Sequence, residues 1–507
     1  MNQPSSEKSR VSRRKFLKTT AGVTLFIGAA GILPQLVSCR NKEAIAALIK
    51  TQPLTAWVEM APNGDIIIFN PAAEMGQGSM TSLPVIFAEE MDAVWEKVRV
   101  EFSPQESEIY GSNGWGPRGK IMLSAGSRIT KGYYPIMRQA GAQVRYILMH
   151  SVSNHLDIPQ EELSTIPGHV VHKNSNREWT FGEILSFLNM PEDLPEFEEG
   201  DLKDPKDYRL IGKIVERTDI PSKVNGSAQF AIDIQLPGML FGVLERGRMH
   251  GAKPQLENKT DIEAMPGVVK VVELDHGIGI ITDKIEQALG AKEALKINWI
   301  DAPTKGFNSE DAYEEYAKVA SSSKKGNVIV DKGNSQNIAR RISSKYTVDF
   351  KNDYVYHAQM EPLNAVVQIA EDGSQAEVWV GSQQGFDSKL GVPKTLGIDP
   401  DKVKVNLQYL GGGFGRRSMT DFVTECTLLA KEVKPSPVKL IWTREDDLTY
   451  GAYRPMSLQR LKAGTDRDGN LLSFSHYIIG DGNNLLASGA RNEFYDIPHQ
   501  HVELRII

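Results

Sequence analysis

Four short loops combine glycine with polar side chains and are the first candidates for chemistry. The most glycine-rich, residues 411–417, has the sequence GGGFGRR between a strand-like run at 403–407 and a helix-like run at 421–431. Glycine lets backbone amides approach a ligand closely, and such amides can bind an anion or an oxo group. Arginines add planar, bidentate donors. The pattern predicts a ligand-binding loop, with a bulged turn carrying two solvated arginines as the alternative. The spacing matches neither a P-loop nor a Rossmann fingerprint.

Three further stretches extend the candidate set. Residues 74–78 (EMGQG) place Gln77, which can donate and accept, between two glycines. Residues 124–128 (SAGSR) combine small hydroxyls, glycine and an arginine, which favours a phosphate cradle. Residues 382–385 (SQQG) place Gln383 at the end of a strand-like run. Taken singly, the EMGQG stretch also fits a structural loop, and the Gly/Ser-rich stretch 111–132, which contains SAGSR, also fits a flexible surface loop.

Alternating and periodic segments around these loops predict the elements that position them. Asn63-Gly64 between the apolar runs 57–60 and 66–69 predicts a β-hairpin. Helices are expected over 81–95, 133–155 and 285–295, and further strands over 98–102, 268–272, 346–350, 378–380 and 502–507. Each candidate loop therefore lies next to the end of a predicted strand or the start of a predicted helix.

Composition limits the kinds of site that the chain can build. The 507 residues are enough for about three domains, and the formal net charge of −6 argues against a nucleic-acid partner. The two cysteines, Cys39 and Cys426, cannot supply the four thiolates of an iron–sulfur cluster, and no close Cys/His spacing predicts a zinc site. Redox chemistry here would require a cofactor held without thiolates. Cys426 falls in a helix-like run and is expected to be buried and structural.

The N-terminus has the pattern of an export signal. Residues 12–18 (SRRKFLK) precede an apolar, Gly/Ala-rich stretch from Ala21 to Val37, which is typical of a twin-arginine signal. The signal ends in Leu36-Val37-Ser38-Cys39, which resembles a lipobox and predicts lipidation of Cys39. The alternative is a cleaved signal with an incidental cysteine. Lipidation would tether the protein to a membrane without spanning it.

Four segments follow from these patterns. Residues 1–39 are the predicted signal, 50–195 a segment containing the EMGQG loop, 208–335 a second domain, and 336–507 a third that contains the GGGFGRR loop. The acidic, proline-bearing stretch 191–207 is predicted to be a linker with solvated charges.

Taken together and in this order, the motifs resemble the molybdopterin-binding subunit of the xanthine dehydrogenase/aldehyde oxidase family, and most closely its isoquinoline 1-oxidoreductase beta-subunit type. The resemblance runs from about residue 52 to the end. It rests on EMGQG (74–78), SAGSR…GYY…RQAGAQ…R (124–145), RTDIPSKVNGSAQFAIDIQLPGML (217–240), HAQMEPLNAVV (357–367), SQQG (382–385), GGGFGRR (411–417) and WTREDD…YRP (442–455).

This resemblance implies an α+β, multi-domain molybdenum-hydroxylase large subunit, in which 208–335 forms an α/β-hammerhead-like domain and 336–507 the first part of the molybdopterin-binding domain. It implies a molybdopterin cofactor, commonly the cytosine dinucleotide, whose dithiolene and not the protein holds the molybdenum. The family hydroxylates an N-heterocyclic aromatic or an aldehyde with oxygen from water. Electrons leave through a small [2Fe–2S] alpha-type subunit, often to a cytochrome c. The signal implies a periplasmic protein, which lipidation of Cys39 would anchor to a membrane.

The resemblance also assigns roles to residues. Phe414 and Gly415 would lie beside an apical oxo ligand, Gln383 would hydrogen-bond to that ligand, and Arg454 matches an arginine that orients substrate. The remaining matched positions would contact the pterin, the pyrophosphate or the nucleotide: Gly76, Gln77, Gly78, Ser124, Gly126, Ser127, Arg128, Gly412, Gly413 and Arg416. The arginines are interpreted as support for the loop or the pterin.

Two departures from the family pattern limit the function. Ser418 stands where purine-oxidising members carry a glutamate, so xanthine is not the expected substrate. The family's general base is a glutamate in a GxGE-like motif, and the sequence reaches Ile507 without one. Either the sequence is a fragment or another polypeptide supplies the base. Glu361, Glu425 and Glu445 are not expected to take that role. The alternative function is a lipid-anchored cofactor-binding or scaffold protein without catalytic activity.

Overall fold

The computed structural model describes residues 52–300, 302–333, 338, 340–491 and 495–507. The predicted signal and Cys39 lie outside these residues. The described chain divides into two compact units. The first comprises residues to Gln235, Ala365–Gly412 and Arg417–Thr424, and the second comprises Leu236–Asn364, Gly413–Arg416 and Glu425–Ile507. The domain limits expected from the sequence stay a prediction.

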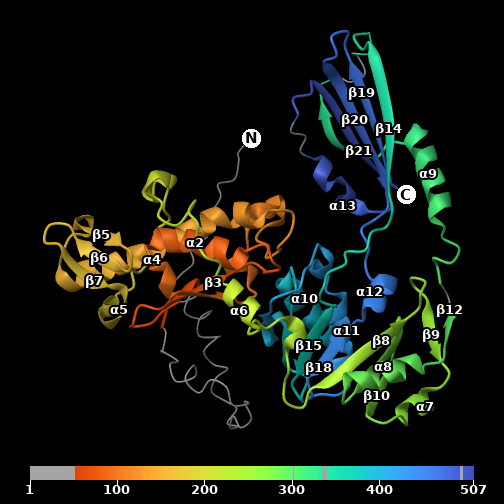
Figure 1. Ribbon diagram of the computed structural model, residues 1–507, viewed down its shortest axis with the longest axis horizontal. Coiled ribbons are helices and arrows are strands. Elements are labelled where there is room, and N and C mark those ends of the chain that lie inside the picture. Colours follow the sequence, from red (N-terminus) through yellow and green to blue (C-terminus); the bar gives the residue numbers. More distant parts are fainter. Residues whose placement is uncertain (1–51, 301, 334–337, 339, 492–494) are drawn as a thin grey trace, which may run out of the picture. The chain divides into compact units, whose positions relative to one another are not determined.

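A small sheet begins the first unit (Figure 1). Its order is β1-β2-β3-β4, with β1 at Gln52–Thr55, β2 at Val58–Met60, β3 at Ile66–Asn70 and β4 at Val98–Phe102. Strands β2 and β3 pair antiparallel across the Asn63-Gly64 turn, which confirms the predicted hairpin. Strand β4 pairs parallel to β3. Helix α2 (Ser79–Met91) connects them and ends four residues before the predicted limit, because Asp92 takes a left-handed conformation with φ 61°.

Helix α4 (Ile129–Leu156) packs with α2 in the apolar core of this unit. Buried apolar residues of the two helices and of the sheet, among them Met60, Phe87 and Met137, form this core. Strands β5 (Leu163–Ile166), β6 (His169–His172) and β7 (Arg177–Thr180), helix α5 (Phe181–Ile184) and the short helices α3 (Ser107–Tyr110) and α6 (Ile220–Asn225) complete this part.

The acidic stretch 191–207 lies along α4 as a strap. Buried Arg138 donates to the Lys203 carbonyl at 2.7 Å, while Gln143 donates to the Pro195 carbonyl at 3.1 Å. The charges of the strap remain largely solvated, since the Glu199 side chain is 80% exposed. The backbone of this predicted linker is therefore fixed to the unit.

A βαβ unit in the same compact unit carries residues 382–385 and the start of the glycine loop. Strand β15 (Asn364–Ile369) pairs antiparallel with β16 (Ala376–Val380), and β16 pairs parallel with β17 (Val403–Leu407). Helix α10 (Gly385–Leu396) connects β16 to β17, and the glycine loop leads from β17 to α11 (Asp421–Lys431). Because β16 and β17 are parallel, residues 382–385 and the start of the glycine loop leave the sheet at the same edge.

In the second unit, β8 (Leu240–Arg246) lies between antiparallel β11 (Gly277–Thr282) and parallel β18 (Val438–Ile441), and β10 (Val268–Leu274) pairs with β11. Helices α7 (Lys259–Glu263) and α8 (Ile285–Glu293) pack on these strands around Val243, Ile278 and Ile280. Strand β9 (Lys253–Leu256) pairs with β12 (Ile297–Ile300), and α12 spans Arg444–Tyr450.

A five-stranded sheet of order β13-β21-β20-β19-β14 forms the rest of this unit (Figure 1). Its strands are β13 (Asn327–Lys332), β14 (Ser344–Asn352), β19 (Ser457–Thr465), β20 (Leu471–Gly480) and β21 (His499–Ile506). Amphipathic helix α9 (Ser309–Ser321) covers one face with Tyr313 and Tyr316, and α13 (Asn483–Ala487) packs on the other. Among the described residues, no helix is long and apolar enough to cross a membrane.

Candidate functional site

The EMGQG loop joins β3 to the N-terminus of α2. Gly76 and Gly78 have φ values of 109° and 91°, which glycine alone adopts without strain. The Gln77 side chain folds back into its own loop, donating to the Ala73 carbonyl at 2.7 Å and accepting from the Met75 amide at 2.8 Å. A Cβ atom on Gly76 would meet nothing within 4 Å. The loop therefore has a fixed shape with an open side.

The Ser124–Arg128 loop lies at the N-terminus of the other long helix, α4. Gly126 and Ser127 are left-handed in succession, with φ values of 61° and 54°. The Arg128 guanidinium lies 4.4 Å from the centre of the Trp115 ring. Helix α4 has no acidic residue in its first turn, so the positive field of its N-terminus is not neutralised there. At the start of α2, the Met80 amide donates to the buried Glu74 carboxylate at 3.0 Å. The N-terminus of α4 is therefore suited to an anionic ligand.

Hydrogen bonds join these two loops to Gln383. The Ala73 amide, next to the EMGQG motif, donates to Ser124 Oγ at 2.9 Å. The Ser124 amide donates to the Gln383 carbonyl at 2.8 Å, and Gln383 Nε2 donates to the Ser124 carbonyl at 2.8 Å. Both residues are buried. Three motifs that are distant in the sequence are thus brought together within the first unit.

The glycine loop is attached to the same strand end. The Arg417 carbonyl accepts from the Gln383 amide at 2.9 Å and from Ser382 Oγ at 3.0 Å, and Arg417 Nη1 donates to the Gly381 carbonyl at 3.0 Å. Both Arg416 and Arg417 are buried. The alternative of solvated arginines is therefore wrong, and Arg417 supports the loop from within.

Residues Gly413–Arg416 belong to the second unit. Phe414 has φ 52° and is 69% exposed, and Gly415 has φ 107°. Non-glycine residues in this conformation are uncommon and are often found at functional sites. A Cβ atom on Gly415 would lie 3.7 Å from His357 Nε2. An exposed aromatic ring and an imidazole thus lie at the tip of the loop.

Asp447 on α12 fixes the surroundings of this tip. It is 1% exposed, and its oxygens accept from Tyr356 Oη at 2.9 Å, from Gln359 Nε2 and, at 3.4 Å, from Arg416 Nε. The Arg416 guanidinium also lies 5.2 Å from the centre of the Trp442 ring. The HAQME segment and the glycine loop are therefore held by one carboxylate. The sequence analysis missed this role, because the partners of Asp447 are distant in sequence.

Burial and the nearby Arg416 charge lower the pKa of His357, which favours the neutral imidazole. Burial, opposed by Arg444 and aided by Asp447, raises the pKa of Tyr356. The side chains of His357 and Tyr356 are thus uncharged near neutral pH.

The structure also gives the contacts of other residues that the sequence analysis named. Arg454 is exposed, and its backbone pairs with Val355. Glu361 is buried and accepts from Asn364 Nδ2 at 3.1 Å, while Glu425 forms an ion pair with Arg246. Cys426 is buried and donates to the Val438 carbonyl at 3.2 Å, as expected for a structural residue. Because Gln383 and Phe414 belong to different units, their joint action on one ligand stays a prediction.

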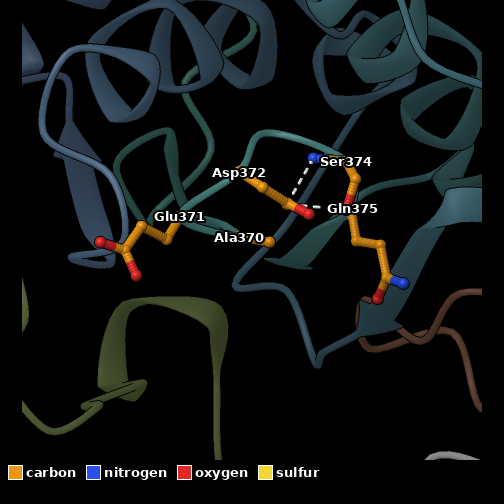
Figure 2. A pocket seen from close by; sticks show the side chains of 5 residues that line it. All are labelled: Ala370, Glu371, Asp372, Ser374 and Gln375. Atoms are coloured by element: carbon orange, nitrogen blue, oxygen red, sulfur yellow. Dashed lines mark hydrogen bonds between the residues drawn. The ribbon is translucent and has the colours of Figure 1, made fainter.

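A surface depression is formed by the turn between β15 and β16, lined by Ala370, Glu371, Asp372, Ser374 and Gln375 (Figure 2). Asp372 Oδ1 accepts from the Ser374 amide at 2.9 Å and from its hydroxyl at 2.7 Å (Figure 2). This turn precedes β16, whereas Gln383 follows the other end of that strand. The depression is therefore separate from the loops described above.

Comparison with known proteins defines the class. Models of molybdopterin cofactor-binding domains match residues 5–227 and 320–506. The chain is 32% identical over 94% of its length to the beta chain of isoquinoline 1-oxidoreductase from Brevundimonas diminuta. It is 28% identical over 93% to a membrane-bound aldehyde dehydrogenase of Gluconacetobacter polyoxogenes, and 25% identical over 85% to one subunit of nicotinate dehydrogenase from Pseudomonas putida. Among solved structures, quinoline 2-oxidoreductase from Pseudomonas putida 86 matches 58% of this chain and 44% of that chain, at 18% identity and a TM-score of 0.49.

These matches show a molybdopterin cofactor-binding protein. The chain belongs to the family of molybdopterin-binding subunits of xanthine dehydrogenase and aldehyde oxidase type, as the motifs predicted. The predicted α+β fold class is confirmed. The chain spans 65%, 60% and 36% of the lengths of the three curated relatives named above.

The residues of the first unit fit such a cofactor. Two glycine-bearing loops with left-handed backbone precede two helix N-termini, and one loop has an open side at Gly76. Pyrophosphate binds well at a helix N-terminus such as that of α4, because amides point outward and the dipole favours negative charge. Among the residues that the structure describes, no cluster of acidic, His or Cys side chains could hold a metal ion.

Proposed function

We propose that the complete protein is a molybdenum-dependent oxidoreductase that oxidises an N-heterocyclic aromatic compound or an aldehyde, with water as the oxygen source. This chain would be its molybdopterin-binding subunit. The observation that carries the proposal is the joining of the EMGQG loop, the Ser124 loop and Gln383 through buried hydrogen bonds. The named activities of relatives, which include isoquinoline and nicotinate oxidation and aldehyde oxidation, support the substrate class.

In this proposal the two loops at the helix ends bind the cofactor. Gly76 and Gly78 allow it to approach the backbone at the N-terminus of α2, and the amides of residues 125–127 bind its phosphates at the N-terminus of α4. The cofactor, in its cytosine dinucleotide form, supplies the two-electron oxidation of the substrate. Arg128, already stacked on Trp115, would neutralise phosphate charge.

Substrate recognition is assigned to the glycine loop and Arg454. The exposed Phe414 ring offers an apolar wall for a planar aromatic substrate, and the neutral His357 beside Gly415 leaves that wall without a formal charge. Gln383 provides an amide donor close to the cofactor, and exposed Arg454 orients the substrate. Ser418, in place of a glutamate, excludes purine substrates of the xanthine type in this account.

Location and partners are part of the proposal. The twin-arginine pattern at 12–18 and Cys39 support export to the periplasm with a lipid anchor, and both lie outside the described residues. Because the chain lacks the thiolates for an iron–sulfur cluster, we assign electron transfer to a separate small [2Fe–2S] subunit, with a cytochrome c as the next acceptor.

The test is purification of the assembled protein from the periplasm, followed by metal, pterin and nucleotide analysis and by turnover assays. Isoquinoline-type heterocycles, nicotinate, aldehydes and xanthine would be compared, with ¹⁸O-labelled water to locate the source of oxygen. The proposal expects a bound pterin with cytosine nucleotide and turnover of a heterocycle or an aldehyde. A loaded protein that oxidises only xanthine would contradict the substrate class. A loaded protein without any oxidase activity would favour the cofactor-binding scaffold.

A further inference from the structure

The segment Arg217–Lys223 (RTDIPSK) has no role in the site described so far, yet it packs against the EMGQG loop within the first unit. Thr218 Oγ1 donates to the Met80 carbonyl at 2.8 Å, and the Thr218 amide donates to Thr81 Oγ1 at 3.0 Å. These bonds place the segment beside the first turn of α2. Its charged side chains then reach the loop itself.

Glu74 is the centre of this contact. It is 0% exposed, and its Oε1 accepts from the amides of Gly76 at 2.8 Å and Gly78 at 3.2 Å. Its Oε2 accepts from Ser79 Oγ and from the Met80 amide, both at 3.0 Å. A carboxylate that receives four donors from one loop and the following helix turn fixes the backbone of that loop. The two loop glycines are among those four partners.

Two cations, Arg217 and Lys223, balance the charge of Glu74 and that of a second buried carboxylate. The second carboxylate is Asp219. Arg217 Nη2 lies 3.4 Å from Glu74 Oε1 and 2.6 Å from Asp219 Oδ2. Lys223 Nζ lies 2.6 Å from Asp219 Oδ2 and 3.7 Å from Glu74 Oε1. Buried charges are tolerated when they are paired and hydrogen-bonded, as these are. The four side chains form an electrically neutral cluster.

The Asp219 carboxyl shows the strength of this pairing. Burial works to raise its pKa, but the hydrogen bonds and charges of Arg217 and Lys223 lower the pKa to about 2. Asp219 is therefore ionised at any physiological pH and keeps both cations in place. Lys223 Nζ also lies 5.0 Å from the centre of the Tyr409 ring, next to the start of the glycine loop.

The cluster covers one side of the loop and leaves the other open. Arg217 Nη1 donates to the Gly76 carbonyl at 3.2 Å, and a Cβ atom on Gly78 would lie 3.7 Å from Arg217 Cζ. A Cβ atom on Gly76 would meet nothing within 4 Å. The loop is thus supported from behind, while its free side is available to a ligand.

We propose that Glu74, Arg217, Asp219 and Lys223 form a clamp that holds the Gly76–Gly78 loop in its cofactor-binding shape. They are positioning residues, since they act on the cofactor through the loop. The inference rests on the proposed function and gives the RTDIPSK segment a task that is separate from substrate binding. It implies that loosening the clamp lowers retention of the cofactor more than it lowers the stability of the fold.

The experiment uses the assembled holoprotein with Glu74→Gln, Arg217→Ala and Lys223→Ala, with Lys223→Arg as the conservative rescue. Asp349→Asn is the matched control, because Asp349 forms an ion pair with Arg460 outside this unit, at 2.7 Å. Pterin and molybdenum per protein, the rate of cofactor loss during gel filtration, and the thermal unfolding midpoint would be measured. Loss of a residue that orients a metal ligand typically weakens metal binding about 10- to 100-fold, and we apply the same factor to residues that orient this loop. We expect the rate of loss to rise by about that factor in the clamp variants, while Lys223→Arg and Asp349→Asn retain the cofactor.

The outcomes separate this inference from the proposed function. A wild-type protein without pterin and molybdenum contradicts the proposed function itself. A wild-type protein that is loaded, with clamp variants that load fully and lose cofactor at the wild-type rate, overturns the clamp. If buried Glu74→Gln does not fold, Arg217→Ala decides, because the Arg217 side chain is 32% exposed and its truncation is tolerated more easily.

Discussion

Gln383 and Ser124, which are 259 positions apart, exchange two hydrogen bonds of 2.8 Å, one through the Gln383 side chain and one through its carbonyl. The pair fixes the start of the Ser124–Arg128 loop to the end of β16. The same pair holds the Gln383 amide nitrogen in place before any ligand binds. Such preorganisation removes the cost of reorienting a donor during reaction.

Replacement of Gln383 by Ala tests this relationship. The variant loses one buried hydrogen bond and leaves the Ser124 carbonyl without this donor, which costs about 1–3 kcal/mol of unfolding free energy. We expect cofactor to remain bound and kcat to fall. Gln384→Ala is the control, since the neighbouring amide makes no bond to Ser124. Steady-state kinetics and pterin content would be measured, and unchanged turnover in Gln383→Ala would count against the assigned role.

Glu89 on α2 predicts an acid-sensitive step in the first unit. Its buried carboxylate accepts from the amides of Arg209 at 2.9 Å and Ile211 at 3.1 Å. Burial works to raise its pKa, but backbone hydrogen bonds and the Lys203 charge lower it below the ordinary 4.5. A lowered pKa stabilises the fold above pH 4.5, and this stability is lost as pH falls through the folded-state value.

We therefore expect Glu89→Gln to lower the unfolding free energy at pH 7 by about 1–3 kcal/mol and to flatten its decline at acid pH. The exposed Glu96→Gln serves as control and should stay within about 0.5 kcal/mol of wild type. Denaturant unfolding between pH 7 and pH 4 is the measurement. Parallel pH profiles of wild type and Glu89→Gln would refute the assignment.

His357 predicts a second pH dependence, in the other unit. Burial, aided by Arg416 and Arg454 and opposed by Asp447 and the Ala452 backbone, lowers its pKa below 6.5. The unfolded chain then binds a proton at a higher pH than the folded chain does, so stability falls as pH drops below about 6.5. Thermal unfolding of His357→Gln should decline less between pH 7.5 and 5.5 than that of wild type. Equal declines would show that His357 does not contribute.

Gly415 has φ 107°, a conformation that strains any other residue regardless of space. Gly415→Ala should lower the unfolding free energy by about 1–3 kcal/mol and reduce turnover, because the tip next to His357 must shift. Gly290→Ala is the matched control: this exposed glycine lies inside α8 and a Cβ atom there would meet nothing within 4 Å. Because alanine is favoured over glycine inside a helix, the unfolding free energy of the control should rise by about 0.4–1 kcal/mol. Calorimetry should show that the unfolding free energy falls in Gly415→Ala and rises in Gly290→Ala. A change of the same sign in both variants would contradict the strain assigned to Gly415.

Local patterns in the sequence were sufficient to predict the elements that carry the loops. The Asn63-Gly64 pair predicts the hairpin that β2 and β3 form. The strand-like run at 403–407, followed by glycines, predicts β17 and the loop after it. These features depend on neighbouring residues. The end of α2 at Met91 was predicted four residues too late, because the apolar pattern continues past Asp92, which terminates the helix by its own backbone conformation.

The supporting carboxylates could not be predicted in the same way. Glu74 binds Arg217 and Asp447 binds Tyr356, and these partners are 143 and 91 positions away in the sequence. The type of a single acidic residue does not indicate whether it is exposed or pairs across the fold. The burial of Arg416 and Arg417 depends likewise on distant partners, so solvated arginines remained an alternative until the structure was known.

Molybdenum and pterin content of the assembled, exported protein tests the central claim most directly. The protein would be purified with its partner chains, and metal analysis would be combined with identification of the released nucleotide. The account predicts about one molybdenum and one pterin cytosine dinucleotide per chain, because it assigns one cofactor to the two loops that precede α2 and α4. Protein that contains neither molybdenum nor pterin under these conditions would contradict it.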